Sequence, residues 1–261
     1  MTFEAETHTY SIDGSSEGVT SVTTLLEDYF PKLDPDTLIE KYYNRWQQHQ
    51  LNKFYGKSRE EIKEMWEVDG KKAAAESPLL HAAIEAYYKK REISYDQESV
   101  ECKYFLSFEE EHLLKLQVHR TEMVLWSSDH KQGVSIGLVV KNADGTFSLY
   151  DWKRTKKAIW KEERHCNRYG SGPLSKLPDN SYHKYCTQLN LYRELMERHY
   201  GYKISSMHVV RIHPNAKQFE VVEVERMEKE ASDLLNLRHL KDVAKDEEAS
   251  LVEKFDALHV L

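Results

Sequence analysis

The stretch that decides the fold is GVSIGLVVKNADGTFSLYDWKRTKK, residues 133–157. It contains two short apolar runs, residues 134–140 and 147–152, which are separated by the sequence NADG at residues 142–145. Asn, Asp and Gly tolerate the positive φ that a tight chain reversal needs, so this pattern predicts a β-hairpin. Working outward from the hairpin, we expect a mixed sheet with helices around it.

Asp151 and Lys153 lie at the end of the second apolar run. Side chains alternate faces along a strand, so an acid and a lysine two residues apart are presented side by side. A carboxylate is a hard oxygen ligand for Mg²⁺ or Mn²⁺, and a neighbouring ammonium can stabilise a phosphorane or hold an attacking water. Most isolated D-x-K tripeptides are solvated surface, but on a strand this pair suits metal-dependent phosphodiester cleavage.

Length and composition narrow the class of protein. A chain of 261 residues with 40% hydrophobic content predicts one large domain, or a domain with helical additions. The three cysteines are far apart, which argues against a zinc or iron–sulfur site and favours a reducing compartment. No long apolar run or secretory signal is visible, so we expect an intracellular protein of the cytoplasm or nucleus with no membrane association.

The formal net charge of -7 argues at first against nucleic-acid binding. Residues 153–176, however, hold eight Lys or Arg against two acids, with Trp160 and Tyr169 among them. The alternatives are a solvated loop and a phosphate-facing surface, and the position directly after Asp-x-Lys favours the second. The candidate nucleic-acid contacts in this stretch are Lys156, Lys157 and Lys161.

Two helical motifs accompany the hairpin. Ser77 followed by Pro78 predicts a helix start, which places His81 in the early turns of that helix. Gln188 and Tyr192 are four residues apart in a predicted helix over residues 182–200, hence on one face. The other predicted elements are helices over 35–50, 60–69 and 225–245, and strands over 101–108, 122–126, 207–212 and 219–224.

In this order the motifs resemble the PD-(D/E)XK nuclease superfamily, in its RecB-type exonuclease branch, which includes mitochondrial genome-maintenance exonucleases and viral and phage relatives. The resemblance covers residues from about 8 to about 224. The residues that carry it are His8-x-Tyr10…Gly14, Ser21-Val22-Thr23-Thr24, Leu80-His81…Ile84-Glu85-x-Tyr87, Thr121-Glu122, Asp151-Trp152-Lys153 and Gln188-x-x-x-Tyr192.

The resemblance implies a single domain over residues 1–261, α/β or α+β in class, with the central mixed sheet of a restriction-endonuclease-like fold. Its parts would be a helical region over about 20–95, a nuclease core over about 96–225 and closing helices over about 226–261. It further implies a Mg²⁺ or Mn²⁺ cofactor and a DNA partner, single-stranded or containing an end. The implied roles are metal ligands for Asp151 and His81, a catalytic lysine for Lys153, a central acid for Glu122, and DNA positioning for Gln188 and Tyr192.

The sequence departs from the family pattern at Gly137. The first hairpin strand of the family carries a metal-binding aspartate in a Gly-x-Ile-Asp pattern, and the matching residues here are VSIG at 134–137. If the numbers of paired hairpin residues sum to 288, Gly137 lies opposite Asp151. We therefore expect a weakened metal site, and we expect Gly137→Asp to raise Mn²⁺ affinity and nuclease activity.

Three functions follow from these features. The first is a metal-dependent DNA nuclease, which the presence of Asp151, Lys153, His81 and Gln188 favours. The second is a catalytically inactive nuclease-fold module that binds nucleic acid or a protein partner, which Gly137 favours. The third is an interaction protein unrelated to nucleic acid, which only the acidic balance supports.

Overall fold

A six-stranded mixed sheet forms the centre of the molecule in the computed structural model, which describes residues 2–4, 9–11, 20–32, 34–92, 95–113, 116–127, 131–162 and 168–258. β5 pairs antiparallel with β4 and β6, β6 pairs parallel with β7, and β7 pairs antiparallel with β8. A short parallel pairing joins β3 to the beginning of β5. The fold class expected from the sequence is thereby confirmed. The strands are β3 (Thr20–Ser21), β4 (Gln117–Ser127), β5 (Gln132–Lys141), β6 (Phe147–Lys153), β7 (Ile204–Arg211) and β8 (Glu220–Glu223).

The predicted hairpin is β5–β6, and its register is the one that the sequence suggested. Leu138 pairs with Tyr150, and the ladder continues to Lys141 opposite Phe147, so partner numbers sum to 288. Gly145 has φ +84° in the turn, a conformation that glycine adopts without steric cost. Asp151 pairs with Val209 on the other side of β6, which places it on an internal strand.

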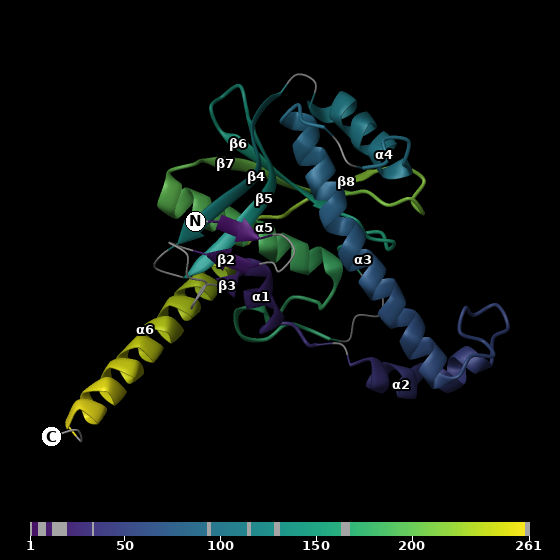
Figure 1. Cartoon of the computed structure of the whole chain (residues 1–261), viewed down its shortest axis with the longest axis horizontal. Coiled ribbons are helices and arrows are strands. Elements are labelled where there is room, and N and C mark those ends of the chain that lie inside the picture. The colour runs from purple at the N-terminus through teal and green to yellow at the C-terminus, as the bar shows by residue number, and fades with distance from the viewer. Residues whose placement is uncertain are drawn as a thin grey trace.

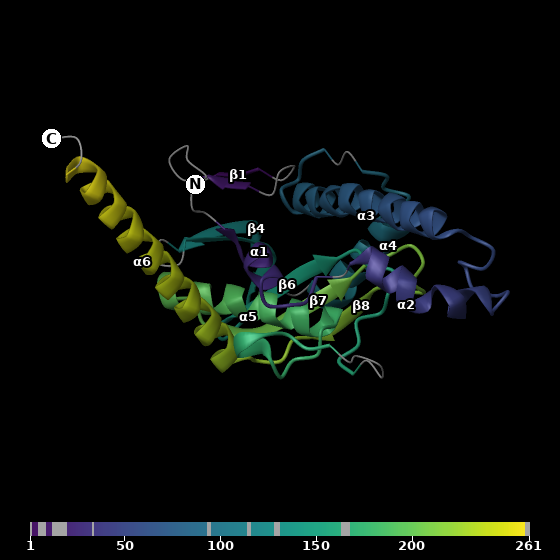
Figure 2. The ribbon, with the colours of Figure 1, turned by 90° about the horizontal axis from the view of Figure 1, so that it is seen from below.

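Helices cover both faces of the sheet (Figures 1 and 2). On one face, Leu149 and Val209 pack with α1, α5 and α6 around Leu189. On the other face, Trp152 packs with α3 and α4 around Phe108. The helices are α1 (Val22–Glu27), α2 (Pro35–Gln47), α3 (Arg59–Tyr88), α4 (Val100–Phe108), α5 (Ser181–Tyr200) and α6 (Glu228–Leu258).

α3 is one continuous helix, and the predicted break at Ser77-Pro78 is wrong. The helix begins at a capping box in which Ser58 and Glu61 exchange hydrogen bonds, and it passes through Pro78. A proline inside a helix removes one backbone hydrogen bond and costs about 3 kcal/mol. Burial of Ile62 against α2 and of Ile84 against the sheet holds the two halves in line and offsets that cost.

The predicted strand over residues 101–108 is also wrong, because this segment is the helix α4. Ser99 caps it by accepting a hydrogen bond from the Cys102 N–H. Its buried residues Glu101, Phe105 and Phe108 have spacings of four and three, which is the period of a helix. One turn of π-helix (Glu109–Leu113) follows.

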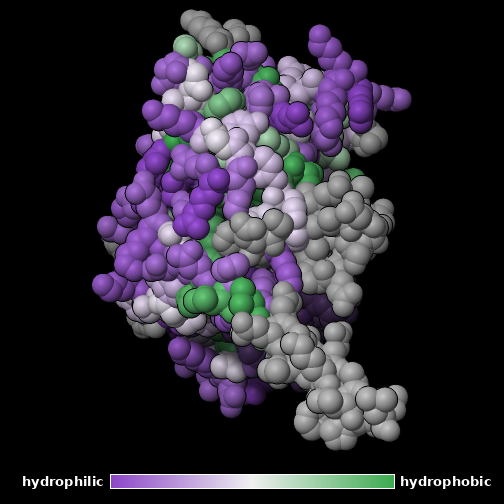
Figure 3. All heavy atoms as spheres, turned by 90° about the vertical axis from the view of Figure 1, so that its left-hand side faces the viewer, coloured by the Kyte–Doolittle hydropathy of each residue, from purple (hydrophilic) through white to green (hydrophobic). Residues whose placement is uncertain are grey.

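The other predicted helices and strands are present, except that residues 60–69 form the first part of α3 and not a separate helix. A two-stranded antiparallel hairpin of β1 (Thr2–Glu4) and β2 (Thr9–Ser11) lies at the N-terminus, whereas His8 and Gly14 fall outside the described residues. The surface on the side of β4 and α6 is mainly hydrophilic, with small apolar areas (Figure 3). Across the described residues, the helices include none that is both long and apolar enough to cross a membrane.

Candidate active site

The end of β6 places an acid and a lysine in contact, on the side of the sheet that α5 covers. Lys153 Nζ lies 2.6 Å from Asp151 Oδ2, and the Asp151 side chain is only 5% exposed. Lys153 Nζ also donates to Gln188 Oε1 at 3.1 Å and lies 4.9 Å from the ring centroid of Tyr185. Burial alone would lower the pKa of Lys153, but the charge of Asp151 holds that pKa above its ordinary value.

His81 reaches the same site from α3. Its Nδ1 is 2.9 Å from Glu122 Oε1, and its Nε2 is 3.1 Å from the carbonyl oxygen of Trp152. Burial disfavours the imidazolium, yet the hydrogen bond and charge of Glu122 raise the pKa of His81 above its ordinary value. Burial likewise works against the Glu122 carboxylate, and the contact with His81 lowers its pKa below the ordinary value. The two side chains therefore form a mutually stabilised pair.

Glu122 is directed toward His81 by a local distortion of two strands. Its φ of +41° is unusual for a residue other than glycine and costs about 1 to 3 kcal/mol. The β4–β5 ladder pairs Thr121 with Leu138 and Met123 with Ile136, and within these described strands it skips Glu122. Ser135 Oγ donates to Glu122 Oε2 at 2.8 Å and anchors the turned carboxylate.

The same distortion changes the surroundings of Gly137. Ile136 belongs to the core under α5, whereas Leu138 belongs to the core under α3, so the strand exchanges faces at residue 137. A Cβ at Gly137 would lie 3.0 Å from Trp152 Cδ1 and 3.3 Å from the Tyr150 carbonyl oxygen. That residue 137 is a ligand position lacking only its side chain stays a prediction, and a side chain there would have to fit beside the buried indole.

A divalent cation at this site would have few protein ligands. Asp151 Oδ2 is buried and makes no well-directed hydrogen bond beyond its ion pair with Lys153. The Trp152 carbonyl lies nearby as a second oxygen ligand, whereas His81 Nε2 would bind a metal only after it loses the proton that it donates to this carbonyl. Within the described part of the chain, no three His, Cys, Asp or Glu side chains gather as a metal group. Mg²⁺ commonly uses one or two carboxylates and completes its shell with waters and substrate phosphates.

Gln188 and Tyr192 lie on α5, as predicted, but neither is an exposed side chain. Gln188 Nε2 donates to the Tyr192 hydroxyl at 2.5 Å, and both residues are buried. Because the Gln188 oxygen accepts from Lys153, this pair fixes the position of the lysine. Tyr185, one turn before Gln188 on the same face of α5, is a site residue that the sequence interpretation missed. Tyr185 and Gln188 are three residues apart, and this helical spacing could have indicated that both side chains lie on the same face.

The basic stretch after β6 is largely paired with acids. Lys156 Nζ lies 3.4 Å from Asp69 on α3, and Lys161 forms an ion pair with Glu225. Lys157 is exposed, and residues 163–167 fall outside the described part of the chain. Phosphate binding at Lys156 and Lys161 would have to compete with these carboxylates.

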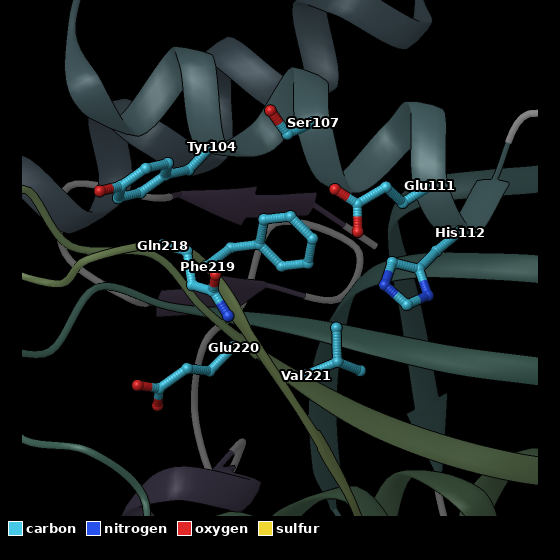
Figure 4. A pocket seen from close by; sticks show the side chains of 8 residues that line it. All are labelled: Tyr104, Ser107, Glu111, His112, Gln218, Phe219, Glu220 and Val221. Atoms are coloured by element: carbon cyan, nitrogen blue, oxygen red, sulfur yellow. The ribbon is translucent and has the colours of Figure 1, made fainter.

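Two cavities help to locate the chemistry. A pocket of about 360 Å³ between α1 and α5 is lined by Phe30, Lys32, Lys184, Tyr185 and Gln188, among others, and it therefore adjoins the partners of Lys153. A larger cavity of about 500 Å³ lies between α4 and β8 (Figure 4). Its lining includes none of the four charged site residues, which are His81, Glu122, Asp151 and Lys153.

Comparisons with known proteins add little to this description. No family model matches the sequence, and no curated protein sequence matches it. One similar solved structure is named "Putative exonuclease" and comes from Eubacterium rectale, with 12% sequence identity and a TM-score of 0.29. The match covers 81% of this chain and 66% of that chain. So low a TM-score does not establish a common fold.

Proposed function

We propose that this chain is a metal-dependent nuclease of the PD-(D/E)XK type that hydrolyses phosphodiester bonds in DNA, at ends or in single strands. The supporting observation is the convergence of His81, Glu122, Asp151 and Lys153 from three elements that are far apart in the sequence. Enclosing four ionisable groups costs stability unless they are paired, and such clusters concentrate at functional sites.

Each residue has a role in this proposal. Asp151, His81 and the Trp152 carbonyl would hold Mg²⁺ or Mn²⁺, which supplies charge neutralisation at the phosphate and acidifies a bound water. Lys153 places a cation beside the negative charge that develops on the phosphoryl oxygens. Gln188 holds the ammonium of Lys153 in place, and Glu122 orients the imidazole of His81.

The alternative is a nuclease-fold module that binds nucleic acid without cleaving it. The observation that favours it is the scarcity of metal-binding side chains in the described residues, together with the 2.6 Å ion pair between Asp151 and Lys153. In this alternative the paired charges are a static network, and nucleic acid is bound elsewhere on the surface.

Two substitutions separate these functions. Labelled single-stranded DNA is incubated with Mn²⁺, with Mg²⁺ or with EDTA, and Mn²⁺ binding is measured in parallel by calorimetry. We expect Asp151→Asn to lose both Mn²⁺ binding and cleavage. Lys153→Met should lose cleavage and keep Mn²⁺ binding, since Lys153 is not a ligand.

Lys71→Ala serves as the matched control, because this exposed lysine of α3 pairs only with Glu67 in the described structure. Its cleavage should equal that of the unmodified chain. Cleavage that survives Asp151→Asn would refute the proposed site. Absence of Mn²⁺ binding and of cleavage in the unmodified chain, together with retained binding of the labelled DNA, would decide for the binding module.

A further inference from the structure

Residues 41–59, which we call the basic arm, carry a charge opposite to that of the whole chain. They hold five Lys or Arg and no Asp or Glu, in a protein of net charge -7. The same residues include five aromatic side chains and His49. The basic arm comprises the second half of α2, the loop after it and the first residue of α3, and it projects from the body of the molecule (Figures 1 and 2).

The basic arm is a built structure with its own small core. Ile39, Phe54 and Ile62 are buried together, and Trp46 and Trp66 pack against them. The loop after α2 is tied back by the Gln47 side chain, which donates to the Phe54 carbonyl at 2.9 Å and accepts from the Gly56 N–H at 2.8 Å. The exposed side chains of the basic arm are therefore presented on a fixed frame.

Three of the five cations of the basic arm lie over aromatic rings. Lys41 Nζ is 5.3 Å from the ring centroid of Tyr42, and Lys53 Nζ is 4.6 Å from that of Phe54. Within the described residues, no carboxylate forms an ion pair with Lys41, Arg45 or Lys53. These charges are thus available to an anionic ligand, unlike Lys156 and Lys161, which face acids.

A pocket lies at the C-terminal half of α2, within the basic arm. It has a volume of about 580 Å³ and is lined by Tyr42, Arg45, Trp46, His49 and Asn52. The rings of Tyr42 and Trp46 are stacked, with centroids 6.0 Å apart and an interplanar angle of 26°. The two rings supply flat apolar surface, while Arg45, His49 and Asn52 supply hydrogen-bond donors at the rim.

We infer that the basic arm binds single-stranded nucleic acid, with unpaired bases stacked in the Tyr42–Trp46 pocket and phosphates on Lys41, Arg45 and Lys53. Every base has a π face that stacks on an aromatic side chain, and arginine adds a cation–π contribution. The phosphates supply the negative charge that the basic arm lacks. A membrane surface fits less well, because the apolar rings line a concave, polar-rimmed pocket.

α3 connects this pocket to the candidate active site. Trp66, which packs edge-on against Trp46, and His81 are 15 residues apart on one helix, or about 22 Å along its axis. The segment after β6 follows the same helix, since Arg154 contacts Glu76 and Lys156 contacts Asp69. A strand held at the basic arm would reach Asp151 after several nucleotides, and this inference takes the nature of the ligand from the proposed nuclease function.

Binding is tested by fluorescence anisotropy in EDTA with a labelled oligothymidine of about 16 nucleotides. An abasic oligonucleotide of the same length measures the contribution of the phosphates alone. We expect Tyr42→Ala to weaken oligothymidine binding about tenfold or more, and Tyr42→Phe to retain it, because only the ring is needed. Abasic DNA should bind more weakly than oligothymidine by a similar factor.

Arg45→Ala is compared with Lys72→Ala, which removes one exposed charge from α3 at a site already paired with Glu76. We expect Arg45→Ala to weaken binding severalfold more than Lys72→Ala, with unchanged circular dichroism in all variants. Equal binding of abasic DNA and oligothymidine, or equal effects of Arg45→Ala and Lys72→Ala, would overturn the inference. So would Tyr42-dependent binding to anionic phosphatidylserine vesicles without binding to oligothymidine. Because EDTA excludes metal catalysis, a failure of the proposed nuclease activity leaves this result unaffected.

Discussion

Adding a side chain at Gly137 should destabilise the protein instead of restoring a metal site. The sequence pattern suggested that Gly137→Asp would return a missing ligand. In the structure, however, a Cβ at this position would lie 3.0 Å from Trp152 Cδ1 and 3.2 Å from Trp152 Nε1. Optimal separation between carbon atoms is about 3.5 to 4.0 Å, so the indole would have to move.

The indole of Trp152 has little room to move. Trp152 is 1% exposed, and its ring packs edge-on against Phe105 and Phe108, with centroids 5.7 and 5.3 Å away. Overpacking of such a core costs about 1 to 3 kcal/mol, which is the loss of unfolding free energy expected for Gly137→Ala. Gly137→Asp adds a carboxylate beside apolar rings, although the Trp152 N–H, which lacks an acceptor, could offset part of that cost.

Urea unfolding of both variants measures the effect, and titration calorimetry measures Mn²⁺ affinity. Gly70→Ala is the matched control, because a Cβ there meets nothing within 4 Å and the residue is inside α3. The unfolding free energy of this control should rise by about 0.5 to 1 kcal/mol, because alanine replaces glycine in a helix. Unchanged stability of Gly137→Ala, or tighter Mn²⁺ binding by Gly137→Asp, would refute the reasoning.

Three further predictions concern other parts of the structure. Pro78→Ala should raise the unfolding free energy by about 1 to 3 kcal/mol, since it restores the missing backbone donor inside α3. A lower unfolding free energy, measured with urea, would show that the proline is required. Arg154→Ala should lower the unfolding free energy by about 3 to 5 kcal/mol, because this buried cation pairs with Glu76 and Glu101. Arg198→Ala, at a half-buried surface pair, should change the unfolding free energy by less than about 1 kcal/mol. Equal thermal shifts of the two arginine variants would contradict that assignment. Gln188→Leu should slow DNA cleavage without changing Mn²⁺ affinity, because Gln188 contacts Lys153 and none of the expected ligands; an unchanged rate would show that Lys153 is positioned without it.

Local sequence determined the elements whose stability is local. The hairpin, its register and the contact between Asp151 and Lys153 follow from a turn sequence between two apolar runs and from the alternation of side chains along a strand. The length of α5 and the shared face of Gln188 and Tyr192 follow from the helical period.

Only the tertiary structure decided the features that depend on partners distant in the chain. Pro78 stays helical because both ends of α3 are packed, and Lys156 faces Asp69, 87 residues away. Glu122 takes a left-handed backbone conformation and meets His81, while Gly137 faces Trp152, because β4 and β5 are distorted at the same level. Neither strand shows a local sequence pattern that predicts this distortion. It is stabilised by contacts with other elements, such as the hydrogen bond between Glu122 and His81 of α3.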